Sequence, residues 1–120
     1  MQTKIILKDV RLYAYHGAQP QEHVVGTAYL LNLEIDTDFT SAMHSDRIAG
    51  TINYADIYEV VKQEMQTPSQ LVEHVAGRIC KALFQHFSSI QSLQLELLKE
   101  NPPIAGCQCA GMGVSLNVKR

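Results

Sequence analysis

The amino-acid sequence predicts one α+β domain, residues 1–120, in which two helices cover one face of a four-stranded antiparallel sheet. Apolar residues recur at every second position in the first third of the chain and again in the last third. Between these stretches they recur at intervals of three and four. Period two is typical of half-buried strands and period 3.6 of amphipathic helices, so the expected element order is β-β-α-α-β-β.

The first two strands are expected to form a hairpin. Residues 4–15 carry one apolar phase, and residues 27–38 alternate cleanly between apolar and polar side chains. A long polar loop from residue 16 to residue 26 connects them. The inward-facing residues are Ile6, Val10, Leu12 and Ala14 in the first strand and Tyr29, Leu31, Leu33 and Ile35 in the second.

Two helices follow the hairpin. Asn53 is the expected N-cap of the first, because its side-chain oxygen can accept a hydrogen bond from a free backbone N–H. Thr67 is the expected cap of the second, with Pro68 and Gln70 at its first and third helical positions, and this helix should end near residues 87–89. The apolar stripes are Ile57, Val60, Val61 and Met65, then Val72, Val75, Ala76, Ile79, Cys80, Leu83 and Phe87.

The last two strands return to period two and complete the sheet. Helices packed on one face leave the other face and at least two strand edges uncovered within one subunit. Association of subunits through these edges is therefore expected. The inward-facing residues are Leu93, Leu95 and Leu97 in the third strand and Met112, Val114, Leu116 and Val118 in the fourth.

The composition argues against several kinds of partner. The formal net charge is -2, and Lys and Arg form no basic stripe, so neither nucleic acid nor an acidic membrane is an expected partner. No segment has the length and apolarity of a membrane span or of a signal peptide. We expect a soluble cytoplasmic protein.

The three cysteines are too few for a disulfide framework and indicate free thiols. Cys80 lies in a helical apolar stripe and is expected in the core. Cys107 and Cys109 could supply two ligands to a metal, but structural zinc sites need four and no His pair accompanies them. No metal site and no cofactor are therefore predicted.

Lys99 continues the apolar phase of the third strand, where a leucine would be expected. It is either a strand-end lysine whose ammonium reaches solvent or a partly desolvated amine for acid–base chemistry. A free lysine has a pKa of about 10.4, so a lysine base needs desolvation or a proton relay. Glu22, in the polar loop, is either a solvated carboxylate or part of the same site.

Glu73 and Tyr54 also have two interpretations. Glu73 lies in the first turns of the second helix, where an acid gains from the helix dipole, and it could accept two parallel N–H bonds from a guanidine-like edge. Tyr54 follows the first helix cap and is either a packing residue or a functional phenol. The histidines have no triad spacing and are expected to be structural: His16, His44, His74 and His86.

Several stretches, in this order, resemble the dihydroneopterin aldolase family. The resemblance implies the tunnelling fold, in which four subunits join their sheets into a barrel and two such rings stack as an octamer. The matching stretches are residues 12–17, Glu22 with Gly26, Ser45-Asp46, residues 51–56, residues 71–73 and residues 99–104.

The resemblance also implies where a pterin ring would bind. Glu73 would hold the 2-amino-4-oxo edge of the ring. Backbone groups around Val72 would help, as would Ile52 across a subunit boundary. Val72 stands where the family more often has Ile or Leu.

The reaction implied by the resemblance is cleavage of 7,8-dihydroneopterin to glycolaldehyde and 6-hydroxymethyl-7,8-dihydropterin, a step of folate biosynthesis. Lys99 would be the general acid and base, Glu22 would help it to hold the trihydroxypropyl tail, and Tyr54 of a neighbouring subunit would relay a proton. Reversal with attack on the other face would give a 2′-epimerase side activity.

Three alternatives stay open. A related epimerase of dihydroneopterin triphosphate would call for a basic cluster near the mouth of the site, and none is evident in sequence. A metal-dependent pterin synthase would need three zinc-binding histidines. A catalytically silent pterin-binding subunit would need only the hydrophobic pattern.

Overall fold

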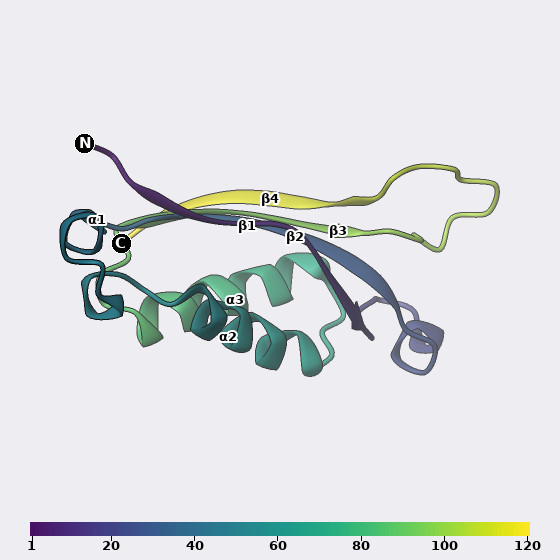
Figure 1. The fold of residues 1–120 in the computed structure, drawn as a ribbon. Helices are drawn as coiled ribbons and strands as arrows, with labels where there is room; N and C mark the ends of the chain where they lie inside the picture. The colour runs from purple at the N-terminus through teal and green to yellow at the C-terminus, as the bar shows by residue number, and fades with distance from the viewer.

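A computed structural model describes residues 1–120 and confirms the predicted order of the main elements. Figure 1 shows α2 and α3 side by side on one face of the sheet, with α1 beyond the end of β2. The strands and main helices are β1 (Lys4–Ala14), β2 (Thr27–Asp36), α2 (Tyr54–Gln66), α3 (Val72–His86), β3 (Ser92–Lys99) and β4 (Met112–Lys119). The shorter elements, which were not predicted, are η1 (Pro20–His23), α1 (Thr40–Ser45) and η2 (Ile48–Gly50).

The sheet has the order β1-β2-β3-β4, and all neighbouring strands are antiparallel. Tyr29 lies opposite Lys99 and Leu31 opposite Leu97, so the inward phases of β2 and β3 coincide, as predicted. Their side chains form the layer on which the helices pack. β1 and β4 each pair with one strand only, so each leaves one edge of its backbone unpaired.

One predicted inward residue of β1 is wrong. Ile6 is 60% exposed and Leu7 is buried in its place. The register with β2 shifts between Leu7 and Val10, and Asp9 has a φ of 52° there. One extra residue in a strand reverses the alternation, so a phase counted back from Leu12 fails beyond this bulge.

Helix α2 begins as predicted. The side chain of Asn53 accepts a hydrogen bond of 2.9 Å from the backbone N–H of Ala55. In α3 the apolar stripe is confirmed, and the helix ends at His86, close to the predicted end. No helix of the chain has both the length and the apolar character needed to cross a membrane.

The predicted start of α3 at Pro68 is wrong, because the helix begins at Val72. Arg78 explains the difference. Its guanidinium donates to the carbonyl oxygen of Thr67 over 2.7 Å and to Ser69 Oγ over 2.9 Å. Ser69 in turn donates its backbone N–H to His16, so tertiary hydrogen bonds hold residues 67–71 outside the helix.

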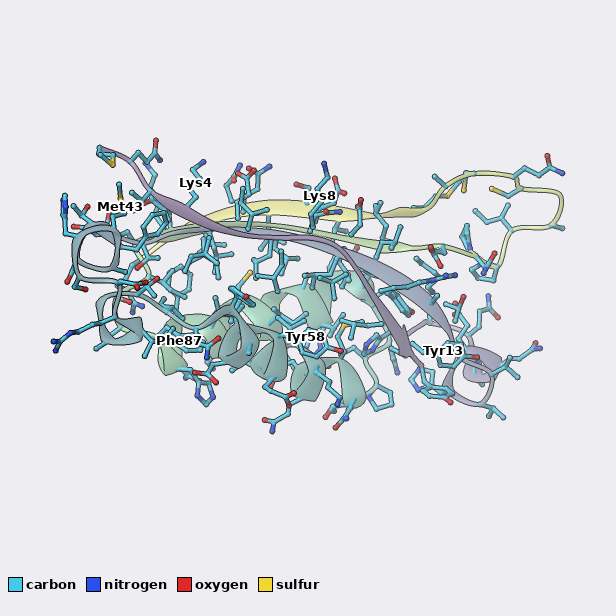
Figure 2. The ribbon with its side chains drawn as sticks, in the orientation of Figure 1. Lys4, Lys8, Tyr13, Met43, Tyr58 and Phe87 are labelled. Carbon is cyan, nitrogen blue, oxygen red and sulfur yellow. The ribbon has the colours of Figure 1, made fainter.

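The two faces of the sheet differ in character. Figure 2 shows Tyr58 and Phe87 on the helical side and Lys4 and Lys8 on the opposite side. The face that carries the two lysines has no helix over it.

Cys80 is buried in the core, as predicted, and burial raises the pKa of its thiol to about 11.

The connection between β3 and β4 projects beyond the helical layer (Figure 1). It contains Cys107 and Cys109, whose sulfur atoms lie 3.6 Å apart. All three cysteines are free thiols. Nowhere in the chain do three or more His, Cys, Asp or Glu side chains gather closely enough to hold a metal ion.

Candidate active site

A partly buried ion pair joins the last residue of β3 to the 3-10 turn η1. Lys99 is 8% exposed, and its Nζ donates a hydrogen bond of 2.6 Å to Glu22 Oε1. The predicted inward phase of Lys99 is therefore confirmed. The alternative of an ammonium in solvent is wrong, because the ammonium meets a carboxylate inside the protein.

Local backbone geometry holds Glu22 in this position. The N–H of Gln19 donates to Glu22 Oε2 over 3.0 Å, and the two residues form a capping box around η1. The side chain of Glu22 lies over Gly17, where a Cβ atom would come within 2.1 Å of Glu22 Oε2. Glycine at position 17 therefore leaves the space that the carboxylate occupies.

Glu22 is ionised at neutral pH. Burial raises the pKa of its carboxyl, but the hydrogen bonds from Lys99 and from the backbone of Gln19 outweigh burial, and the net pKa lies below its ordinary value. The positive charges of Lys99 and His23 act in the same direction. The pair is thus a carboxylate beside a cationic amine.

Tyr29 forms the floor beneath the pair. The Nζ of Lys99 lies 5.8 Å from the centroid of the Tyr29 ring, and the phenol donates to the carbonyl oxygen of His16 over 2.8 Å. Burial and the negative charge of Glu22 raise the pKa of Tyr29 to about 12. Its hydroxyl therefore stays protonated and has a structural role.

His16 was expected to be structural, yet it lies beside the ion pair. Its Nδ1 accepts the backbone N–H of Ser69 over 2.9 Å. Burial, followed by the charges of Arg78 and Lys99, lowers the pKa of His16 to about 4, so the ring is neutral. Its Nε2 is buried and has no hydrogen-bond partner.

A cavity of about 560 Å³ opens at this end of the sheet. Its wall includes Glu22 and His16, together with Thr27 at the start of β2 and Asn101 and Pro103 after β3. A volume of this size falls within the range of small-molecule sites. Of the ion pair, Glu22 thus lies in the wall of a space that could admit a ligand, with Lys99 directly behind it.

Glu73 and Val72 lie at the first turn of α3. This turn is close to the cavity, because the N–H of Gly17 donates to the carbonyl oxygen of Ser69 over 2.9 Å just before the helix begins. Glu73 is exposed, and its carboxylate takes part in none of the four ion pairs of the chain. It is free to accept hydrogen bonds from a ligand.

Tyr54 and Ile52 lie elsewhere in the subunit. Helix α2 begins on the side of α1 and runs toward η1, so its N-terminal end lies away from η1 (Figure 1). Tyr54 is 71% exposed, whereas Ile52 is buried against the core. Within one chain, the structure brings Lys99 and Glu22 together, places Glu73 and Val72 at the same end, and leaves Tyr54 and Ile52 apart.

Comparison with known proteins decides the family. The family model described as FolB, dihydroneopterin aldolase, matches residues 5–117. The chain belongs to the dihydroneopterin aldolase family. A dihydroneopterin aldolase of Streptococcus pyogenes serotype M18 is 37% identical over 118 residues, which are 98% of each chain. The resemblance found in the sequence is confirmed, and the chain is placed among the aldolases of folate biosynthesis.

Solved structures of dihydroneopterin aldolases share the fold. The Escherichia coli enzyme, in complex with neopterin, superposes with a TM-score of 0.87 at 24% identity, covering 97% of this chain and 98% of its own. The Burkholderia thailendensis enzyme, bound to guanine, gives a TM-score of 0.78 at 14% identity, covering 99% and 92%. The α+β tunnelling fold of the subunit is thus confirmed.

Proposed function

We propose that this chain is a metal-independent aldehyde-lyase that cleaves 7,8-dihydroneopterin into 6-hydroxymethyl-7,8-dihydropterin and glycolaldehyde. The observation that carries the proposal is the partly buried pair of Lys99 and Glu22, with Glu22 in the wall of a cavity of about 560 Å³. An amine hydrogen-bonded to a carboxylate, and largely shielded from water, suits proton transfer to and from a hydroxyl.

Glu73 is assigned to the pterin ring. A carboxylate accepts two parallel N–H bonds from a 2-amino-4-oxo edge, and the carboxylate of Glu73 has no ion-pair partner of its own. Neopterin and guanine, which occupy the two related structures, both carry this edge. Backbone groups near Val72, and Ile52 from an adjacent subunit, would complete the ring site.

The reaction proceeds as a retro-aldol cleavage. Lys99, in its neutral form after its proton has been relayed away through Tyr54, takes the proton of the 2′-hydroxyl. The C1′–C2′ bond then breaks as C2′ becomes the aldehyde carbon of glycolaldehyde. The electron pair of that bond moves into the C6=N5 imine of the ring, and a proton then adds at C1′. Because the ring itself accepts the electron pair, the reaction needs neither a metal ion nor a lysine Schiff base.

The proposal includes a site shared between subunits, with Tyr54 of a neighbouring chain relaying the proton. Three features support a tetramer or an octamer: the unpaired edges of β1 and β4, the helix-free face of the sheet, and the exposure of Tyr54. A cytoplasmic location belongs to the same proposal, because the free thiols of the chain suit a reducing compartment.

An assay with 7,8-dihydroneopterin and a metal chelator tests the function. We expect purified protein to release glycolaldehyde at an undiminished rate in the chelator. Lys99→Ala should lower kcat by about 10²-fold or more, the usual contribution of a positioned acid–base group. Lys81→Ala is the matched control, because Lys81 is exposed and forms no ion pair. Equal turnover in the Lys99 variant and in the control would remove Lys99 from its assigned role.

A triphosphate substrate is less well supported. No Lys or Arg is among the residues that line the cavity, whereas a triphosphate calls for several cationic side chains. The same assay with dihydroneopterin triphosphate, followed by separation of the 2′-epimers, distinguishes the two substrates. Epimerisation of the triphosphate without cleavage of dihydroneopterin would favour the epimerase.

A further inference from the structure

The connection between β3 and β4 carries a pair of thiols that the proposed reaction does not use. Cys107 and Cys109 are separated by one residue, and their sulfur atoms lie 3.6 Å apart. Cys109 is exposed and Cys107 is half-buried, so reagents in solution can reach the pair. Cys80, the third thiol, is buried in the core. The accessible thiol chemistry of the chain is therefore concentrated at this pair.

The surroundings of the two sulfur atoms suit a disulfide better than a metal ion. Structural zinc sites need four ligands, whereas nowhere in the chain do three or more His, Cys, Asp or Glu side chains gather closely enough to hold one. Two neighbouring thiols without further ligands are the reactants of a disulfide bond. In a disulfide the sulfur atoms lie about 2.05 Å apart, so these two must approach each other by roughly 1.6 Å.

The backbone around the pair permits this approach. Residues 107–110 lie outside the helices and strands. One backbone–backbone hydrogen bond involves this segment, from the N–H of Cys107 to the carbonyl oxygen of Ile104 over 3.1 Å. Gln108 and Ala110, on either side of Cys109, are exposed. Cys109 can therefore move toward Cys107 without breaking a strand or displacing a core side chain.

The two thiols are not equivalent. Cys107 Sγ donates the hydrogen bond to Cys109 Sγ. This hydrogen bond, followed by burial and by the negative charge of Cys109, raises the pKa of the Cys107 thiol. Cys109 therefore loses its proton first, and it is also the more exposed sulfur. Since the thiolate is the nucleophile in disulfide exchange, Cys109 is the attacking residue and Cys107 the resolving one.

We propose that Cys107 and Cys109 form a site of reversible oxidation, at which a small disulfide of the glutathione type converts the two thiols into one intramolecular disulfide. The Cys109 thiolate attacks one sulfur of the small disulfide, whose S–S bond breaks and releases one small thiolate. Cys107, after losing its proton to water, attacks Cys109 Sγ and releases the second. The protein loses two electrons and two protons, and the small disulfide is reduced to two thiols.

The inference does not depend on the proposed function, because it uses only the geometry and accessibility of the two thiols. In a reducing compartment the pair rests as two thiols and is oxidised when small disulfides accumulate. The reaction is reversible there, because an exposed disulfide is more easily reduced than a buried structural one.

Mass spectrometry of the purified, reduced protein after incubation with glutathione disulfide tests the site. Remaining thiols are blocked with N-ethylmaleimide before digestion. We expect the peptide that contains Cys107 and Cys109 to lose two hydrogen atoms and to take up no maleimide, and dithiothreitol should restore both thiols. Cys80→Ala is the matched control, because it removes only the buried thiol and should leave oxidation of the pair unchanged.

Single substitutions separate the two steps of the reaction. Cys107→Ser and Cys109→Ser should each stop at a stable mixed disulfide with glutathione, because no second thiol can close the ring. In the unaltered protein the closing step is intramolecular, with an effective concentration of about millimolar or higher, so protein that carries glutathione on both residues should stay a minor species. Glutathione on both residues as the main product, disulfides between subunits, or no reaction of the pair would overturn the proposal.

Pulse labelling of the unaltered, reduced protein tests the order of attack. A brief pulse of N-ethylmaleimide should label Cys109 before Cys107, because the maleimide reacts with the thiolate. Faster labelling of Cys107 would contradict the assigned roles.

Discussion

Neighbouring side chains hold the ammonium of Lys99 in one position. Glu22 accepts its hydrogen bond, and the ring of Tyr29 lies beneath it. Tyr29 is itself anchored to the backbone of His16. A small number of side chains from β2, β3 and η1 thus determines where a proton could be taken from a ligand.

His16 should make the stability of the protein depend on pH. Its pKa is about 4 in the folded state, against an ordinary value of 6.5, because of burial and of the charges of Arg78 and Lys99. A depressed histidine pKa means that only the unfolded chain takes up the proton between these values. The stabilisation is complete above pH 6.5 and is lost as the pH falls toward 4, by roughly 2 to 3 kcal/mol.

Urea unfolding measured across this pH range checks the prediction. His16→Asn should flatten the slope, since Asn does not titrate, while His86→Asn, near the C-terminus of α3, serves as the control. An identical slope in the unaltered protein and in the His16 variant would contradict the assignment.

Gly17→Ala should reduce activity by displacing Glu22. The added Cβ would lie 2.1 Å from Glu22 Oε2, so the carboxylate must leave its place beside Lys99. We expect kcat/KM for dihydroneopterin to fall by about tenfold or more, the effect of losing one charge-assisted hydrogen bond. Gly77→Ala is the control, because a Cβ there meets no atom within 4 Å. Full activity in the Gly17 variant would mean that Glu22 is not required.

The positions and contacts of the individual site residues were only partly predictable from the sequence. Lys99 was found because period two assigns its side chain to the inward phase, whatever the rest of the chain does. Its contact with Glu22 joins residues 77 positions apart in the sequence. That contact depends on the conformation of η1, which the hydrophobic periodicity does not predict. His16 accepts its hydrogen bond from Ser69, which lies in a loop that the local pattern had assigned to a helix.

At the scale of elements, periodicity located all the main strands and helices, and the errors lie where tertiary contacts outweigh local preference. In β1 the bulge at Asp9 reverses the phase, and Asp9 gains a hydrogen bond of 2.7 Å from its N–H to Asn32. Before α3 the capping pattern of Thr67 and Pro68 is sound by itself. The hydrogen bonds of Arg78 outweigh it. Arg78 lies 11 positions after Thr67, so a short sequence window does not reveal this contact.

Arg78→Ala should destabilise the segment before α3. The guanidinium binds the carbonyl oxygens of Glu64 and Thr67 as well as Ser69 Oγ, and its removal leaves these acceptors without their donor. We expect a loss of about 2 kcal/mol in the free energy of unfolding, measured by denaturant titration. Lys81→Ala should change it by less than about 0.5 kcal/mol. Hydrogen exchange at the amide of Ser69 should also accelerate, and an unchanged rate would show that the loop holds without Arg78.

At the scale of the whole molecule, a single subunit leaves surfaces that other subunits could cover. Two strand edges and one face of the sheet lie open, and Tyr54 is exposed at the end of α2 that lies on the side of α1. The need for association followed from the pattern of the sequence, because helices were expected on one face only. Which side chains meet across a subunit boundary depends on the assembly, and the sequence of one chain does not specify that geometry.

Mixing two inactive variants tests the shared site. Lys99→Ala and Tyr54→Phe should each have low activity alone. When they are unfolded together in equal amounts and refolded, roughly a quarter of the sites should combine an intact Lys99 with an intact Tyr54 from different chains. Recovery of dihydroneopterin cleavage to about that fraction is the expected result. No recovery, with oligomers formed normally, would mean that both residues act within one chain or that Tyr54 has no role.

The pairing of Lys99 with Glu22 has a consequence for synthesis on the ribosome. When both helices have been made, Glu22 has been outside the exit tunnel for many residues, but β3 has not yet been translated. Until then the carboxylate has no ammonium to meet, and Tyr29 has no partner strand on its β3 side. The proposed acid–base pair is therefore incomplete until β3 has been made, and a chain truncated before Lys99 should show no cleavage of dihydroneopterin.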